Sequence, residues 1–135
     1  MGAPKNMKII VFSFGFKYGS PFDVNYLIDV RFLPNPFWVD ELKPKTGQQK
    51  DVADYVLLSD AGIGFTDHLH QFIDFVVSQN MNVGKTVIRI GVGCTGGRHR
   101  SVAVAENIAA LLREKPVELT LSHRDIEKDG SVSGD

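Results

Sequence analysis

The stretch from residue 86 to residue 123 constrains the fold most, because it combines a strand pattern, a glycine-rich turn, a helix pattern and a second strand pattern. The β-branched run TVIRIGV (86–92) predicts a buried strand, and apolar residues at helical spacing predict a helix over 101–115. Pro116 follows that helix, and VELTLSH (117–123) alternates apolar and polar residues as a strand does. Together they predict a βαβ unit, with a right-handed crossover if the strands are parallel.

Two further strands are predicted near the N-terminus. The runs 8–14 and 26–33 are rich in β-branched and aromatic residues, and glycine or proline follows each of them. The turn-rich segment 37–50 is long enough to be a functional loop. Strands interleaved with helices predict an α/β fold, a single domain with layered βαβ units around a small, mostly parallel sheet.

Two helices are predicted before the βαβ unit. Asp51 is expected to cap a short helix over 51–59, and the AGIG segment (61–64) is expected to break it. Thr66 is expected to cap a second helix over 67–79, where apolar residues recur at helical spacing.

The chain length and composition are those of one globular domain. The chain has 135 residues, of which 43% are apolar and 23% charged, which suffices for one hydrophobic core. We expect residues 1–7 to be a loose or tag-like N-terminus, residues 8–124 to form the domain, and residues 125–135 to be a polar, frayed tail.

The glycine-rich turn has the chemistry of a phosphate site. Ligands of open α/β sheets lie at the carboxyl ends of strands, and GCTGGRHRS (93–101) follows such an end. Its glycines allow several main-chain N–H groups to face one point, and the first N–H groups of the next helix lack partners inside that helix. The turn does not match a Walker nucleotide loop. The candidate phosphate ligands in it are Gly93, Cys94, Thr95, Gly96, Gly97, Arg98, His99, Arg100 and Ser101.

The single cysteine allows a second interpretation of this turn. Cys94, Gly97, Arg100 and Ser101 match the spacing C-x-x-G-x-x-R-S, which resembles the signature loop of protein tyrosine and dual-specificity phosphatases. In such an enzyme Cys94 would attack phosphorus and Arg100 would hold the phosphoryl oxygens. Gly93 stands where those enzymes usually have histidine, and no general acid is identified. The alternative role for Cys94 is that of a small residue at a strand end.

Four longer stretches resemble one family. These are SFGFKYGSPFDVNYLIDVRFLPNP (13–36), TGQQKDVADYVL (46–57), GVGCTGGRHRSVAVAENIA (91–109) and SHRDIEK (122–128). In the same order and spacing they are similar to the C-terminal domain of the RapZ/YvcJ family, whose members are known as RNase adapter proteins or nucleotide-binding proteins of the P-loop kinase type. The resemblance implies a fold similar to a phosphofructokinase subdomain. It also implies binding of glucosamine 6-phosphate and, in enteric members, of small regulatory RNA.

The resemblance therefore implies a stand-alone binding and sensor module for a phosphorylated metabolite such as an aminosugar or sugar phosphate. The nucleotide chemistry of the family's N-terminal domain is not implied, because the Walker loop of that domain is missing here. Asp29 and Arg31 either line the sugar pocket or form a structural ion pair. Lys17 either reaches an anionic ligand or is a solvated lysine. His123 either bonds a hydroxyl or phosphate of the ligand or is a capped surface histidine. The candidate ligand residues outside the turn are Lys17, Tyr18, Asp29, Arg31, Asn35, His123 and Arg124.

RNA binding is expected to be weak or absent, although an RNA-binding adapter remains an alternative. The formal net charge is −1, and residues 125–135 contain one lysine and four acidic residues, whereas nucleic-acid affinity depends on cations that displace counterions. The aromatic side chains are expected in the core rather than in a stacking platform for bases; these are Phe12, Phe32 and Phe72.

The remaining predictions concern metals, cofactors, the cellular compartment and partners. His68 and His70 do not share a helix face, and no paired carboxylates stand at ligand spacing, so we expect no metal and no cofactor. One cysteine suits a reducing compartment, and no signal peptide or apolar run of membrane length occurs. We expect a cytoplasmic protein that is more a sensor than an enzyme. A protein partner is possible, and the sequence leaves the oligomeric state open.

Overall fold

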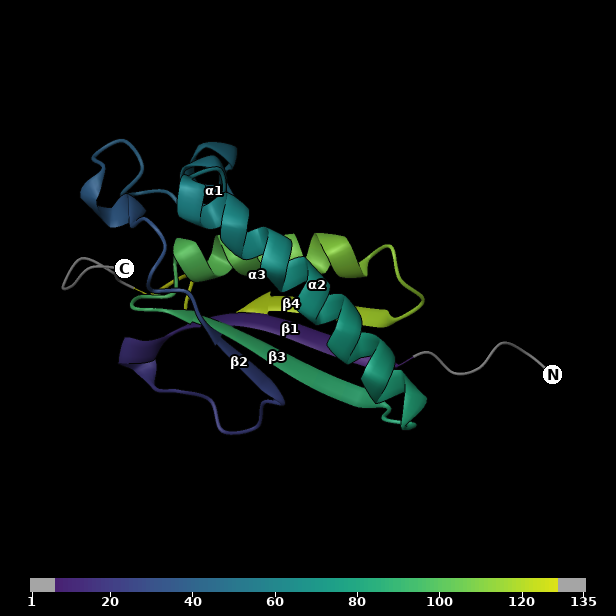
Figure 1. Cartoon of the computed structure of the whole chain (residues 1–135). Coiled ribbons are helices and arrows are strands. Elements are labelled where there is room, and N and C mark those ends of the chain that lie inside the picture. Colours follow the sequence, from purple (N-terminus) through teal and green to yellow (C-terminus); the bar gives the residue numbers. More distant parts are fainter. Residues whose placement is uncertain (1–6, 129–135) are drawn as a thin grey trace.

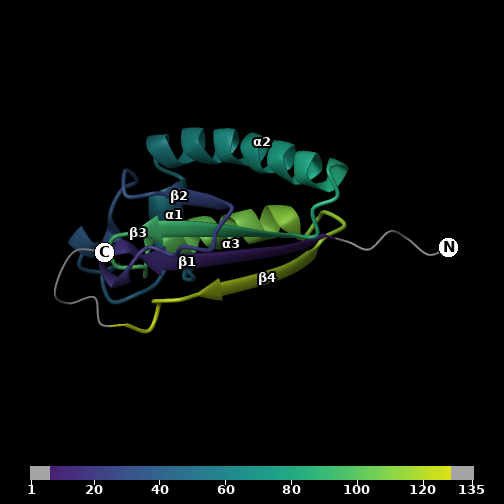
Figure 2. The same ribbon diagram turned by 90° about the horizontal axis from the view of Figure 1, so that it is seen from below.

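Four parallel strands form one sheet, and three α-helices cover only one of its faces (Figures 1 and 2). This computed structural model describes residues 7–128. The strands are β1 (Lys8–Gly15), β2 (Tyr26–Asp29), β3 (Val87–Cys94) and β4 (Glu118–His123). The helices are α1 (Lys50–Leu57), α2 (Asp60–Asn82) and α3 (Arg100–Leu112), with short 3-10 helices η1 (Phe16–Tyr18) and η2 (Pro36–Trp38). The predicted single-domain α/β fold is confirmed, and the described sheet is entirely parallel.

The N-terminal strand lies inside the sheet, whose order is β2-β3-β1-β4. Gly15 at the end of β1 pairs with Cys94 at the end of β3, and Asp29 at the end of β2 pairs with Gly93. β4 runs beside β1 and ends at His123. All four strands therefore end at one edge of the sheet, on the left in Figure 1.

The core lies between the sheet and the helices. Ile9 and Val11 of β1 and Ile88, Ile90 and Val92 of β3 are fully buried there. Because side chains alternate along a strand, one row faces the helices. Burying each such side chain contributes about 1.5–3 kcal/mol. The residues of α3 in this core include Val104, Ala105, Ile108 and Leu112.

The opposite face of the sheet is covered only near the ends of the strands. Phe12 and Phe14 of β1 lie on this face, next to positions in β3 that carry glycine. A Cβ atom at Gly93 would lie 2.5 Å from the Phe14 ring and 2.6 Å from the Phe16 ring. Glycine in β3 therefore makes room for aromatic rings of β1 and η1. Edge-to-face contact between Phe14 and Phe16, with ring centroids 4.9 Å apart, brings η1 onto this face.

The boundaries predicted for the second helix are wrong. α2 begins at residue 60 and passes through the AGIG segment (61–64) that was expected to break a helix. Ser59 caps it, since its Oγ accepts the Gly62 N–H at 3.0 Å. Thr66 lies inside the helix, and its hydroxyl donates to the carbonyl of Ile63.

Close packing between α1 and α2 explains one of the two glycines in that segment. A Cβ at Gly62 would lie 2.3 Å from the carbonyl oxygen of Val56 in α1, whereas a Cβ at Gly64 would meet nothing within 4 Å. Gly62 therefore permits the sharp passage from α1 to α2. α1 begins at residue 50 after the N-cap Gln49, so Asp51 lies in its first turn instead of capping it.

Three other expectations also differ from the structure. β2 ends at Asp29 and does not continue to residue 33. Phe32 and Phe72 were expected in the core, but their side chains are 59% and 46% exposed. Phe12 is buried as expected. Each exposed ring packs edge-to-face on a half-buried aromatic neighbour, so it covers the core from outside.

Most of the predicted N-terminal segment (1–7) and tail (125–135) lies outside the described residues. Of the helices in the described part, none is both long and apolar enough to span a bilayer.

Candidate functional site

The turn between β3 and α3 packs backbone to backbone against the end of β1. Gly97 has a φ of +82°, a value that glycine adopts readily. A Cβ at Gly97 would lie 2.7 Å from the Gly15 nitrogen, and a Cβ at Gly15 would lie 2.5 Å from the Gly96 carbonyl carbon. The carbonyl of Thr95 also accepts the main-chain N–H of Lys17 at 3.1 Å. Glycines on both segments are therefore needed for this approach.

A buried carboxylate lies behind this contact. Asp125 is fully buried, and its Oδ2 accepts the Gly15 N–H at 2.7 Å. Arg124 forms an ion pair with it at 2.8 Å, and Lys128 forms another at 2.7 Å. Burial alone would raise the pKa of Asp125, but the hydrogen bonds from Arg124, Gly15 and Lys128 together lower it below the usual value. Asp125 therefore stabilises, in its charged form, the junction of β1 and the segment after β4.

Two residues of the turn hold the long loop before α1. Arg98 donates from Nη2 to the carbonyl of Pro44 at 3.1 Å and from Nη1 to that of Ile126 at 3.1 Å. His99 Nε2 lies 3.1 Å from the carbonyl oxygen of Lys43. The carbonyl of Arg98 accepts the Gly47 N–H at 2.9 Å. These bonds fix the loop 43–47 beside the turn.

Arg100 starts α3 and is 5% exposed. Its Nη1 donates to the carbonyls of Arg31 at 2.7 Å and Leu33 at 3.3 Å. Its positive charge also contributes to lowering the pKa of Asp29 below the usual value, although the hydrogen bond from Arg31 is the larger cause. Arg100 therefore anchors the segment after β2 and places positive charge at the same edge.

Asp29 and Arg31 form the ion pair that the structural interpretation predicted. The Arg31 guanidinium bonds both oxygens of Asp29, the shortest contact being 2.6 Å, and it lies 4.0 Å from the centroid of the Phe16 ring. Both side chains are close to half exposed, at 47% and 46%. The pair is thus positioned at the rim, where a ligand could reach it.

Cys94 points into the core and not into solvent. It is the last residue of β3, its side chain is fully buried, and its Sγ donates to Ser101 Oγ at 3.1 Å. A nucleophile must reach its substrate, so this position favours the structural role of Cys94 over the phosphatase interpretation.

His123 faces α3, on the covered side of the sheet. Its Nδ1 lies 2.7 Å from Ser13 Oγ, and its Nε2 lies 2.8 Å from Glu106 Oε2. The histidine therefore ties β4 to β1 and α3. Asn35 also has a local role, because its Oδ1 accepts the Phe37 N–H and caps η2.

The structure brings the glycine turn, Lys17, Tyr18, Arg124 and the Asp29–Arg31 pair to one edge of the sheet. Lys17 is exposed, and its Nζ lies 5.4 Å from the centroid of the Tyr18 ring. His123 and Asn35, in contrast, are engaged by neighbouring structural groups.

Sequence reasoning missed Asp125, Glu106 and Gly47. Asp125 begins the segment expected to be a frayed polar tail, and no local pattern distinguishes it from its exposed neighbours. All three residues stand in stretches quoted for the family resemblance, which was the one signal that could have found them. A Cβ at Gly47 would lie 2.4 Å from the carbonyl oxygen of His99.

No group of three or more His, Cys, Asp or Glu side chains between residues 7 and 128 is placed to hold a metal ion.

Comparisons with known proteins agree on one family. The family model described as RapZ C-terminal domain matches residues 7–127. A "Nucleotide-binding protein" of Caldicellulosiruptor saccharolyticus is 47% identical over 125 residues, which are 93% of this chain and 43% of that protein. A protein of the same name from Corynebacterium aurimucosum is 51% identical over 118 residues, 87% of this chain and 40% of that protein. The chain thus spans about two fifths of the length of these relatives.

Proposed function

The chain belongs to the RapZ C-terminal domain family, and on that premise we propose that it binds a phosphorylated small molecule, an aminosugar or sugar phosphate, at the turn between β3 and α3. The relatives bear the name nucleotide-binding protein, which also points to a phosphorylated ligand. They are more than twice as long as the matched segment, so the proposal for this chain depends on its own turn.

The main-chain geometry of the turn carries the proposal. Within residues 7–128, neither the Gly96 nor the Gly97 amide makes a hydrogen bond, and both amides lie in the turn that leads into α3, which begins at Arg100. Main-chain N–H groups at a helix start, together with the positive end of the helix dipole, form an anion site. The two glycine amides add main-chain donors from the turn beside this helix start, and such donors suit the oxygens of a phosphate group.

The charge of the surrounding side chains supports the same assignment. Arg98 and Arg100 flank the turn and are fixed by hydrogen bonds to main-chain carbonyls, so their charge stays in place without a ligand. Fixed cations recognise an anion with little ordering cost. We assign the phosphate to the turn, with its charge balanced by these two guanidinium groups.

The sugar portion is assigned to the exposed rim. Asp29 and Arg31 offer carboxylate and guanidinium groups at the end of β2, where hydroxyl or amino groups of a sugar can bind both. Lys17 and Tyr18 form the other side of this edge. We do not assign His123 and Asn35 to ligand contacts, because their polar atoms serve Ser13, Glu106 and Phe37.

Calorimetry with glucosamine 6-phosphate, glucosamine and inorganic phosphate tests the proposal. We expect the sugar phosphate to bind, and Arg100→Gln to weaken its binding by about 1.5–3 kcal/mol, the usual value of a hydrogen bond to a charged group. Arg113→Gln is the matched control, because Arg113 is an exposed cation at the other end of α3. It should leave the affinity unchanged.

Thermal unfolding of both variants must accompany this measurement, since Arg100 also anchors residues 31 and 33. Equal affinity for glucosamine and its phosphate would contradict a phosphate site, and so would undiminished binding by a folded Arg100→Gln variant.

A further inference from the structure

Two cations and two aromatic rings form a row across the carboxyl edge of the sheet, on the face opposite the helices. The guanidinium of Arg124, after β4, lies 5.5 Å from the centroid of the Phe14 ring of β1. Phe14 packs edge-to-face on Phe16 of η1, with ring centroids 4.9 Å apart, and the guanidinium of Arg31, after β2, lies 4.0 Å from the Phe16 centroid. Both cations of this row are candidate ligand residues, whereas the two rings between them are not.

Gly93 of β3 permits the row to cross the sheet. It pairs with Phe14 of β1 on one side and with Asp29 of β2 on the other. A Cβ atom on Gly93 would lie 2.6 Å from the Phe16 ring, so this ring occupies space over β3 that a side chain would otherwise take. Phe16 thereby extends from the end of β1 to the ion pair at the end of β2.

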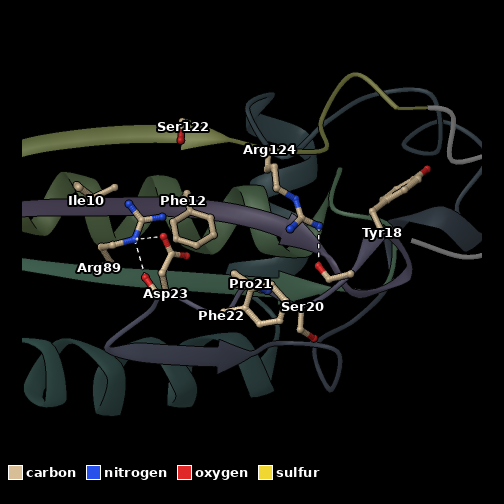
Figure 3. A pocket seen from close by; sticks show the side chains of 11 residues that line it. Ile10, Phe12, Tyr18, Ser20, Pro21, Phe22, Asp23, Arg89, Ser122 and Arg124 are labelled. Atoms are coloured by element: carbon tan, nitrogen blue, oxygen red, sulfur yellow. Dashed lines mark hydrogen bonds and ion pairs between the residues drawn. The ribbon is translucent and has the colours of Figure 1, made fainter.

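The other end of η1 is held as well. Gly19, the C-cap of η1, has a φ of +101°, and its carbonyl accepts a hydrogen bond from Arg124 Nη2 at 2.7 Å (Figure 3). Arg124 is itself paired with the buried Asp125 at 2.8 Å. Because η1 is fixed at both ends, the Phe16 ring has a defined position.

Arg31 is ordered by its neighbours and still has N–H groups available to a ligand. Its Nε and Nη2 donate to the Asp29 carboxylate at 3.0 Å and 2.6 Å, and its guanidinium lies over the Phe16 ring. Within residues 7–128, Arg31 Nη1 makes no hydrogen bond, and the side chain is 47% exposed. A ligand at this edge can therefore accept hydrogen bonds from a guanidinium that is already held in place.

We propose that Phe16 is a positioning residue for the sugar portion of the ligand, because its ring holds the Arg31 guanidinium so that Nη1 can donate to a sugar oxygen. The inference rests on the proposed function. An arginine side chain loses rotamer freedom when it binds a ligand, and prior contact with an aromatic face removes part of that cost. The cations assigned to the phosphate, Arg98 and Arg100, are held by main-chain carbonyls instead. Phe16 therefore determines how well the site distinguishes a sugar phosphate from inorganic phosphate.

Calorimetry of Phe16→Leu with glucosamine 6-phosphate and with inorganic phosphate tests the inference. We expect sugar-phosphate binding to weaken about three- to tenfold, the factor that corresponds to losing one cation–π contact, while the phosphate affinity changes less than about twofold. Phe16→Tyr keeps an aromatic ring and should bind both ligands as the wild type does. Phe22→Leu is the control and should also bind both normally, because Phe22 belongs to the same loop, is 99% exposed, and lines a hollow to which Arg31 does not contribute (Figure 3).

A double-mutant cycle tests whether Phe16 acts through Arg31. In an Arg31→Met background, Phe16→Leu should change the sugar-phosphate affinity less than about twofold, because the side chain that the ring positions is already gone. Thermal unfolding of each variant shows whether it is folded. Phe16→Met, which fills more of the same space, replaces Phe16→Leu if the leucine variant does not fold.

The outcomes separate this inference from the proposed function. A wild type that binds neither ligand would overturn the proposed function and, with it, the role of Phe16. Where the wild type binds, a folded Phe16→Leu variant with unchanged sugar-phosphate affinity, or with equal losses for both ligands, would overturn the role of Phe16 alone. So would a loss in Phe16→Tyr as large as that in Phe16→Leu, or an undiminished loss in the Arg31→Met background.

Discussion

Asp125 links three segments that are far apart in the sequence. Its carboxylate accepts the N–H of Gly15 and pairs with Arg124 and Lys128, although it is completely buried. A carboxylate whose pKa is lowered on folding stabilises the protein above the unfolded pKa, near 3.9, and loses this contribution as the pH falls through the folded pKa. Asp125 should therefore be among the groups that set the acid limit of stability.

Asp125→Asn is expected to lower the free energy of unfolding at pH 7 by about 2 kcal/mol, because the amide cannot form the charge-assisted bonds. Its stability should then fall less steeply than that of the wild type below about pH 4. Urea unfolding at several pH values measures both effects. Glu127→Gln, an exposed neighbour, should change stability by less than about 0.5 kcal/mol. A variant with the same acid slope as the wild type would contradict this role.

At the scale of single residues, the sequence predicted the residues of the turn better than the residues that hold the neighbouring segments in place. The glycines, arginines and the Asp29–Arg31 pair stand in recognisable local patterns. Asp125 and Glu106 act through partners about 110 and 17 residues away. Such contacts exist only once the strands are in register, so no local pattern indicates them.

At the scale of elements, α2 shows how glycine misleads sequence reasoning. Glycine lowers helix propensity by about 1 kcal/mol relative to alanine, so AGIG favoured a break. In the structure the capping bond from Ser59 and the packing of Leu69, Ile73 and Val77 outweigh that cost. The predicted existence of this helix is therefore confirmed, while its start was placed too late.

The two glycines of α2 should respond in opposite ways to alanine. Gly64→Ala is expected to raise the free energy of unfolding by about 0.5–1 kcal/mol, because the added methyl group meets nothing within 4 Å. Gly62→Ala should lower it by about 1–3 kcal/mol, since its Cβ would lie 2.3 Å from the carbonyl of Val56. Chemical denaturation measures both. Equal effects of the two substitutions would contradict the close passage from α1 to α2.

At the scale of the whole molecule, the position of β1 inside the sheet decides which distant parts of the chain must come together. Lys8 pairs with Val87 on one side and with Glu118 on the other, so the first strand finds both partners late in the chain. The sequence predicted four strands and their α/β class from periodicity. It did not predict the order β2-β3-β1-β4, because periodicity contains no information about which strands become neighbours.

Folding is expected to be slow for a chain of this length. Sheet pairing over such sequence separations requires closing long loops before contacts form, which places refolding in the range of milliseconds to seconds. Stopped-flow circular dichroism after dilution from urea measures the rate. Complete refolding in less than about 100 microseconds would contradict this expectation.

The central position of β1 also has a consequence during synthesis. The ribosome releases this strand early, but the strand that closes its second side appears only after residue 118. Until β3 emerges, β1 has two open flanks, and until β4 emerges it still has one, a state that chaperones bind and proteases cleave. A messenger truncated before β4 would therefore yield a product destined for degradation and not a smaller functional domain.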